Sequence, residues 1–199
     1  MSDFSFRKKK GLTFYRKKIK IKKGVVGTVF ECIFIALIVS FVAFVLVWLF
    51  GIKTAVVGSS MEPGLHNTQE VYMDRMIYLI SAPKRGDVIA FLPKGNEKTH
   101  YYIKRVIAVP GEKIQIKDGR IYIDGKLFED EYGSESIRDA GLAENEFELK
   151  EDEFFVLGDN RNFSEDSRSG NIGAVNRKDI YGKVWFSKKT DEYKGGFVK

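Results

Sequence analysis

The chain has 199 residues, of which 44% are hydrophobic and 30% charged, a mixture that can bury a core and is not typical of disordered proteins. Its formal net charge of +6 would suit a nucleic-acid-binding protein if the excess lay on the folded part. Residues 1–24 alone hold ten Lys or Arg against one Asp, so they carry +9 and the remainder carries −3. The charge distribution therefore argues against nucleic acid as a partner.

An apolar segment follows the basic residues. Residues 32–50 contain no charged side chain, and Ser40 is the only polar one. As a helix, these 19 residues would span about 29 Å, close to the hydrocarbon thickness of a bilayer. A buried core helix is rarely apolar on every side, and the core of a cleavable export signal is shorter. We therefore predict a basic tail over residues 1–24 and a membrane anchor helix over residues 25–52.

Charge also predicts how the anchor is oriented. Basic residues next to a membrane segment stay in the cytoplasm, so the rest of the chain is expected outside the plasma membrane. Cys32, the single cysteine, lies within the anchor, and the exported part is therefore predicted to have no disulfide. We expect a single-pass plasma-membrane protein with a cytoplasmic N-terminus and the lipid bilayer as a partner.

Beyond the anchor, short strand-like segments alternate with turns. The clearest hairpin joins residues 114–117 to residues 120–123 through Asp118-Gly119, and Asp124-Gly125 predicts a second turn. No further long helix is expected after residue 51. Val, Ile, Tyr and Phe recur at every second position in residues 87–93, 101–111, 113–128, 153–160 and 181–188.

These segments predict a mainly β fold. We expect an antiparallel, sheet-like or barrel-like domain over residues 53–188, tethered by one N-terminal transmembrane helix and followed by a tail over residues 189–199. Residues 129–150 are acidic and irregular, which favours a surface excursion. Residues 71–80 are apolar and favour the core, although a loose helical spacing could instead turn one side toward the membrane, namely Met73, Met76, Ile77 and Ile80.

The sequence offers a serine nucleophile but no obvious histidine base. His66 and His100 both lack the context of a Ser-His-Asp site. A lysine can act instead if burial keeps its amine neutral. Lys104 fits this requirement, because strand alternation places it on one face of an apolar segment and Arg105 on the other. An ordinary surface lysine on an edge strand is the alternative.

Four short motifs together resemble a known family. In this order and spacing they are similar to the type I signal peptidases, membrane-bound serine proteases that remove export signals. The small size of the chain resembles the Gram-positive branch of that family. The motifs are GSSMEP at residues 58–63, PKRGDVIAF at 83–91, YYIKRVIAVPGE at 101–112 and GDNRNFSEDSR at 158–168.

The resemblance implies a catalytic dyad. Ser60, directly before the methionine, would be the nucleophile, with Ser59 as its neighbour. Lys104 would be the general base that takes the serine proton, and an acyl-enzyme would follow. Gly58 stands where some members carry a serine whose hydroxyl donates to the oxyanion. The oxyanion hole would then depend mainly on the backbone N–H of Ser60, with the second donor unassigned.

Supporting roles follow from the same resemblance. Ser164 would position the lysine amine, and Asp166 and Arg168 would form a pair that braces the site. Met61 and Pro63 would provide an apolar lid and a turn beside the substrate. The sequence departs from the common pattern at Gly64, where threonine is frequent, and at Phe163, where a small or polar residue is frequent.

The resemblance also implies the partners. Substrates would be exported preproteins with small side chains at the first and third positions before the cut, commonly Ala-x-Ala. No cofactor is expected, and two separated histidines with one membrane cysteine indicate no metal site. A dedicated peptidase for pilus or other specialised precursors is an open alternative. A non-catalytic membrane-anchored assembly protein is another, although it would be expected to lack the serine or the lysine.

Overall fold

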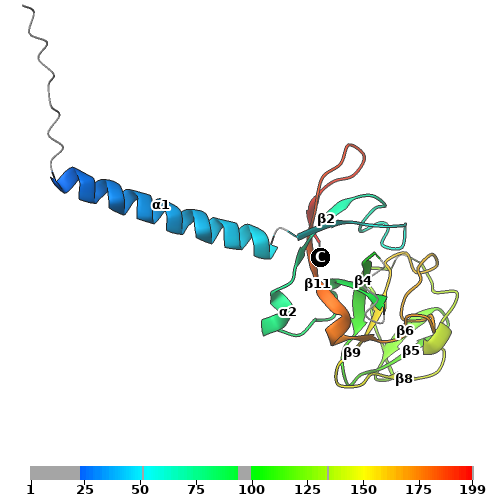
Figure 1. Ribbon diagram of the computed structural model, residues 1–199. Helices are drawn as coiled ribbons and strands as arrows, with labels where there is room; N and C mark the ends of the chain where they lie inside the picture. Colours follow the sequence, from blue (N-terminus) through cyan, green and yellow to red (C-terminus); the bar gives the residue numbers. More distant parts are fainter. Residues whose placement is uncertain (1–22, 51, 94–99, 134, 199) are drawn as a thin grey trace, which may run out of the picture. The chain divides into compact units, whose positions relative to one another are not determined.

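The computed structural model describes residues 23–50, 52–93, 100–133 and 135–198. The predicted basic tail lies almost entirely outside these described residues. By their internal contacts the residues form two compact units, one up to Ala43 and one from Phe44 onward. The first unit is dominated by a helix, and the second by β-sheet (Figure 1).

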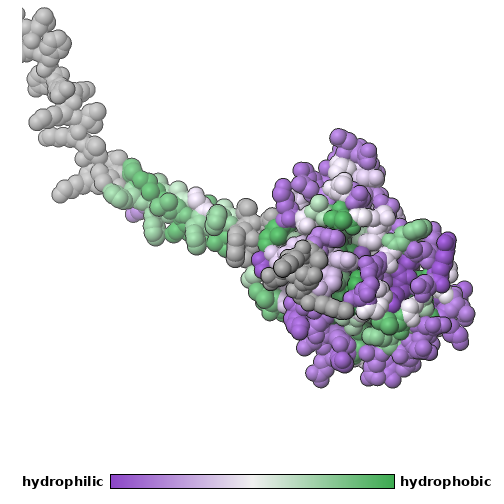
Figure 2. Space-filling model, turned by 45° about the vertical axis from the view of Figure 1, so that its right-hand side comes forward, coloured by the Kyte–Doolittle hydropathy of each residue, from purple (hydrophilic) through white to green (hydrophobic). Residues whose placement is uncertain are grey.

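Helix α1 (Lys23–Phe50) confirms the predicted N-terminal apolar helix. The 20 residues Gly27–Leu46 have a mean hydropathy of 2.8, and none of this stretch is buried by the rest of the protein. Hydrophobic side chains make up most of its visible face in Figure 2, and many of them are exposed. Among the described residues, α1 is the one helix long and apolar enough to cross a bilayer.

The larger sheet confirms the predicted antiparallel β fold. Its strands run in the order β1-β2-β11-β3-β4-β9-β10, and β12 pairs with β11. Every pairing is antiparallel. The strands are β1 (Ile52–Ala55), β2 (Glu70–Asp74), β3 (Val88–Phe91), β4 (Tyr102–Ala108), β9 (Glu153–Leu157), β10 (Val175–Asn176), β11 (Ile180–Ser187) and β12 (Gly196–Phe197).

The smaller sheet contains the hairpin that the sequence predicts. Asp118 and Gly119 both adopt positive φ, 50° and 73°, as a two-residue turn between twisted strands requires. Asp124 and Gly125 repeat these values at the second predicted turn. The strand order is β7-β6-β5-β8, with β5 (Lys113–Lys117), β6 (Arg120–Ile123), β7 (Lys126–Leu127) and β8 (Phe147–Glu148).

The predicted surface excursion, residues 129–150, contributes to the core. Ile137, Ala143 and Leu149 are buried in the cluster beneath the smaller sheet. This segment also contains β8 and the short 3-10 helix η2 (Gly141–Ala143). A second 3-10 helix, η3 (Arg177–Asp179), precedes β11. The segment is acidic on average, but these few apolar residues are sufficient to anchor it to the core.

Residues 71–80 do not form one helix. Their first half is strand β2, in which Val71 and Met73 are fully buried, so the core prediction is confirmed there. Their second half is the one-turn helix α2 (Ile77–Ile80), and there the side chains of Leu79 and Ile80 are 71% and 89% exposed. The loose helical spacing was therefore misleading, because it combined positions from a strand and from a helix.

The segment predicted as a C-terminal tail folds back onto the domain. Strand β12 pairs with β11, and Val198 packs against a buried cluster that includes Met61 and Leu65. The side-chain amide of Gln69 donates to the carbonyls of Lys188 and Lys194. The end of the described chain is therefore tied to the loop that follows the first strand.

Candidate active site

Ser60 lies on the turn-rich loop between β1 and β2. Gly58 precedes it with φ of +83°, a left-handed conformation that favours glycine. The N–H of Gly58 donates to Oδ1 of Asn67 at 2.8 Å. Immediately after the serine, Met61 is fully buried, and its carbonyl accepts from the N–H of Leu65 at 2.8 Å. Buried side chains and these bonds hold the serine in place from both sides.

Lys104 comes from the middle of the larger sheet and meets this serine. Strand β4 lies between β3 and β9, and Lys104 on it is only 4% exposed. Its Nζ lies 2.6 Å from the Oγ of Ser60, within hydrogen-bond distance. The two residues are 44 positions apart in the sequence. The alternative of a surface lysine on an edge strand is wrong.

Burial changes the acidity of this amine. Desolvation lowers the pKa of Lys104 to about 8, from an ordinary value of 10.5, because the charged form loses its hydration. The nearby carboxylates of Asp166, Glu165 and Asp159 act in the opposite direction by attracting the ammonium form. With that pKa, about a tenth of the amines are neutral at pH 7. The site thus holds a usable base next to a hydroxyl.

Arg105, the next residue on β4, is equally buried but stays paired. Its Nε and Nη2 donate to the two carboxylate oxygens of Asp159 at 2.8 and 2.7 Å, and its guanidinium lies 4.0 Å from the ring centroid of Tyr132. Sequence reasoning missed Asp159, although it lies inside the GDN motif. Gly64, a departure from the family pattern, packs against the same carboxylate. A Cβ at that position would lie 2.7 Å from Asp159 Oδ2.

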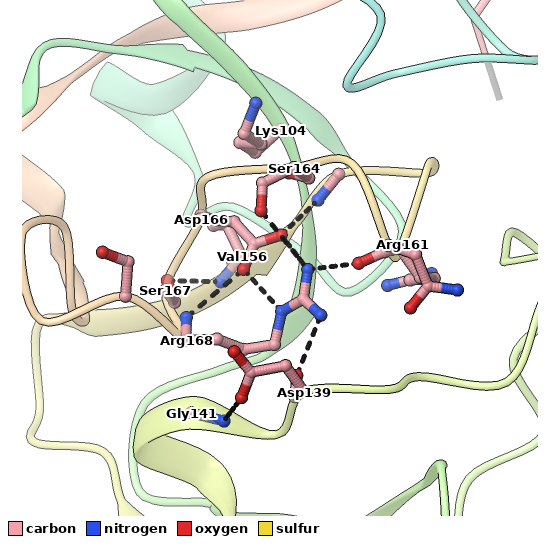
Figure 3. A network of polar contacts seen from close by, with 12 residues as sticks. Lys104, Asp139, Gly141, Val156, Arg161, Ser164, Asp166, Ser167 and Arg168 are labelled. Atoms are coloured by element: carbon pink, nitrogen blue, oxygen red, sulfur yellow. Dashed lines mark hydrogen bonds and ion pairs between the residues drawn. The ribbon is translucent and has the colours of Figure 1, made fainter.

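The Asp166–Arg168 pair closes the loop that follows β9. Asp166 accepts from Nε and Nη2 of Arg168 at 2.8 and 2.9 Å and from the N–H of Gly158 at 3.1 Å. Arg168 also donates to the carbonyls of Arg161 and Asp139, so its guanidinium connects this loop to the segment that contains Asp139 (Figure 3). The structure brings the predicted pair together, and its position supports a bracing function.

Arg161 is a further buried cation that sequence reasoning missed. Its side chain is fully buried, and Nη2 pairs with Asp130 at 2.8 Å. Burial lowers its pKa. Nε and Nη1 have no hydrogen-bond partner among the described residues. Gly133 packs directly against the guanidinium, since a Cβ there would lie 2.4 Å from Nε. The GDNR motif therefore contains two buried, ion-paired residues, Asp159 and Arg161, which the alternation of apolar residues in the sequence does not indicate.

Ser164 lies on the loop after β9 and does not hydrogen-bond to the lysine amine. Its Oγ is buried and has no hydrogen-bond partner among the described residues. Figure 3 shows the Lys104 amine directed away from it. Ser164 packs instead against Gly158, where a Cβ would lie 2.3 Å from the serine Oγ. The positioning role that the resemblance implies for Ser164 stays a prediction.

A cleft of about 160 Å³ opens beside the dyad. Neither Met61 nor Pro63 lines it: Met61 is a core residue beneath the serine, and Pro63 is exposed. Their predicted contacts with substrate stay a prediction. Phe163, the other departure from the family pattern, is 69% exposed. The lining residues are Val56, Val57, Ser60, His100, Tyr101, Tyr102, Ile103, Lys104 and Glu165.

The two histidines serve as ring-stacking partners. His66 stacks on Tyr193 with ring centroids 3.6 Å apart, and His100 stacks on Tyr102 at 5.4 Å. In the part of the chain that the structure describes, no group of three or more His, Cys, Asp or Glu could hold a metal ion. The amine of Lys104 is the titratable group within hydrogen-bond distance of the serine hydroxyl.

Several known proteins are similar in sequence to this chain. The family profile described as signal peptidase, peptidase S26 matches residues 27–187. Signal peptidase I P of Bacillus subtilis subsp. natto is 36% identical over 173 residues, covering 83% of this chain and 90% of the relative. Signal peptidase I of Bacillus licheniformis is 35% identical over 136 residues, covering 65% of this chain and 72% of the relative.

One solved structure, a signal peptidase I from Enterococcus faecalis V583, is 28% identical with a TM-score of 0.40. That match covers 53% of this chain and 98% of the solved chain. The family profile spans most of the sequence, and the natto relative aligns over nearly its whole length. The resemblance noted from the four motifs is therefore confirmed, and this chain belongs to the signal peptidase family, peptidase S26.

Proposed function

We propose that this protein removes signal peptides from exported preproteins by means of a Ser60–Lys104 dyad. The observation that carries the proposal is the 2.6 Å distance between a buried amine and a hydroxyl that both line one cleft. Membership of the signal peptidase family supports the same activity. A serine endopeptidase needs a nucleophile, a base matched to working pH and an open cleft, and the site supplies each of them.

One amine carries the proton transfers of both steps of the reaction, acylation and deacylation. Neutral Lys104 takes the proton of Ser60 as Oγ bonds to the carbonyl carbon of the scissile peptide, and the carbonyl π electrons move to oxygen. When that oxyanion collapses, the C–N bond breaks and the ammonium gives its proton to the leaving amine. Lys104 then activates a water that hydrolyses the acyl-enzyme and restores the Ser60 hydroxyl.

Chain geometry supports a site close to a membrane. Helix α1 is long enough to span a bilayer, and β1 begins at Ile52, two residues after the helix ends at Phe50. Ser60 is ten residues beyond Phe50, which limits its separation from the helix end to about 33–36 Å of extended chain. With a cytoplasmic N-terminus, the dyad would face the outer surface, where membrane-held precursors present their cleavage sites.

The cleft also suggests which side chains are admitted. At about 160 Å³ it is small, and the branched side chains of Val56, Val57 and Ile103 line it. Small residues at the first and third positions before the cut would fit such walls, whereas large aromatic ones would not. We therefore propose preproteins with Ala-x-Ala sites as substrates.

The test uses the full chain in detergent micelles or lipid vesicles. It should cleave a precursor with an Ala-x-Ala site, and Ser60→Ala and Lys104→Met should each reduce cleavage to background. Lys117→Met, at an exposed position on β5, is the matched control and should cleave normally. Circular dichroism would verify that all variants fold. Full activity in either dyad variant would refute the proposal.

A further inference from the structure

Asn160 contacts the backbone of the nucleophile loop at two adjacent carbonyls. Its side-chain Nδ2 donates to the carbonyl of Ser59 at 3.2 Å, and its backbone N–H donates to the carbonyl of Ser60 at 3.1 Å. Asn160 lies on the loop after β9, about a hundred residues downstream in the sequence. The Ser59 carbonyl also accepts from the N–H of Glu62 at 3.2 Å. The peptide groups around the nucleophile are therefore held from outside their own loop.

The planarity of the peptide bond transmits this contact to the nucleophile. The Ser59 carbonyl and the Ser60 N–H belong to one trans peptide unit, in which C=O and N–H point in opposite directions. Fixing the carbonyl on Asn160 therefore directs the N–H away from it. Ser60 lines the cleft, whereas Ser59 and Asn160 do not. Within the residues that the structure describes, the Ser60 N–H donates to no acceptor.

We propose that Asn160 is a positioning residue that aims the Ser60 N–H at the oxyanion. This inference rests on the proposed function. As Ser60 Oγ adds to the scissile carbonyl, negative charge develops on the carbonyl oxygen, and a donor already oriented toward it costs no rearrangement. Without the Asn160 amide, the Glu62 N–H alone holds the Ser59 carbonyl, and the peptide unit rotates more easily about its flanking bonds. The N–H then spends part of its time turned out of the cleft.

The chemistry of the side chain explains why an amide suits this position. A carbonyl oxygen only accepts, so the atom that faces Ser59 must be the NH₂ group of Asn160. An aspartate would place a charged acceptor against another acceptor. On the other side of the loop, Asn67 uses the opposite end of its amide, accepting from Gly58 N–H. Two asparagines thus hold two peptide units of this loop: Asn67 bonds to the Val57–Gly58 unit, and Asn160 bonds to the Ser59–Ser60 unit that contains the nucleophile's N–H.

The test separates transition-state stabilisation from folding and substrate binding. In the full chain in micelles, Asn160→Ala should lower kcat on an Ala-x-Ala precursor by about tenfold with KM unchanged. Loss of a whole oxyanion donor costs about 10²–10³, and the remaining bond from the Glu62 N–H limits the loss. Asn160→Asp should cost more than Asn160→Ala and provides a second variant if alanine impairs folding.

A pair of ligands supplies the readout that a structural role would not change. A peptide aldehyde adds Ser60 Oγ to its carbonyl and leaves the oxygen in the oxyanion position, whereas a peptide with Pro after the cleavage site binds without reacting. Asn160→Ala should weaken the aldehyde by about the same factor as kcat and leave the Pro peptide unchanged. The matched control is Asn162→Ala, because Asn162 bonds to Glu135 and Ser136 instead of the serine loop.

Unchanged kcat in Asn160→Ala and Asn160→Asp would overturn the inference, and so would an equal loss of affinity for both ligands. These outcomes differ from failure of the proposed function. In that case the native chain itself would not cleave the precursor, and Ser60→Ala would have no activity to remove.

Discussion

Two neighbouring cations on strand β4 show how the same burial gives opposite chemistry. Lys104 and Arg105 are both 4% exposed. Arg105 has a carboxylate fully engaged with its guanidinium, so its charge is compensated. Lys104 contacts a neutral hydroxyl instead, and desolvation lowers its pKa to about 8. A buried cation therefore becomes a base only if it is desolvated and also lacks a carboxylate directly paired with it.

The largest effect is expected from making the two cations alike. Lys104→Arg keeps a positive group at the dyad but removes the neutral form, because a guanidinium does not lose its proton in proteins. Cleavage should fall by about 10³-fold or more. Single-turnover cleavage of an Ala-x-Ala precursor measures this. Activity within tenfold of the native chain would show that the neutral amine is unnecessary.

The second prediction concerns Arg105 and removes the charge of its carboxylate partner, Asp159. Asp159→Asn leaves a buried guanidinium without its carboxylate and should lower the free energy of unfolding by about 3–5 kcal/mol. Chemical denaturation of the full chain in micelles would show it. Glu146→Gln, which breaks an exposed ion pair with Lys113, is the control and should leave stability nearly unchanged. Equal effects of the two variants would contradict the assignment.

Lys104 should also reduce stability in a pH-dependent way. Its folded pKa, about 8, is below the ordinary value of 10.5, so the unfolded chain binds this proton more tightly. Stability should therefore rise with pH between about 8 and 10.5, and the full penalty applies below 8. Lys104→Met should unfold at a higher temperature than the native chain at pH 7. This advantage should shrink as the pH approaches 10.5, as scanning calorimetry would reveal.

The smallest effect concerns the carboxylates around the amine. Activity should increase with pH through about 8 as Lys104 deprotonates. Glu165 raises the pKa of that amine, so Glu165→Gln should move the rise in kcat/KM to lower pH. A pH series on the precursor measures the shift. A movement to higher pH would mean that Glu165 acts on substrate binding and not on the base.

Local features of the fold were predictable from sequence because their causes are local. Asp118-Gly119 sets a two-residue turn by its own backbone preferences, and the alternating isoleucines of β5 and β6 fix the register. The spacing of apolar residues gave the wrong result for residues 71–80, because a strand and a one-turn helix lie within one apolar stretch. Periodicity has no means of finding a boundary inside a continuous apolar segment.

The site was predictable only in part, because its contacts join distant segments. The apolar surroundings of Lys104 indicated burial, but its meeting with Ser60 came from the family resemblance and not from any spacing rule. The Arg105–Asp159 pair spans 54 residues, and no pattern in either segment names the partner. Asn160 contacts the nucleophile loop through backbone carbonyls, which every residue carries, so composition gives no sign of it.

The pairing of β12 with β11 has a practical consequence for anyone who shortens this protein for inhibitor screening. A truncation after residue 188 would remove the strand that covers Phe186 and Ser187, together with the Tyr193 ring that stacks on His66. The loop holding the nucleophile would lose its support from the far end of the polypeptide. Affinity tags therefore belong beyond residue 199, joined by a flexible spacer, with the last strand left intact.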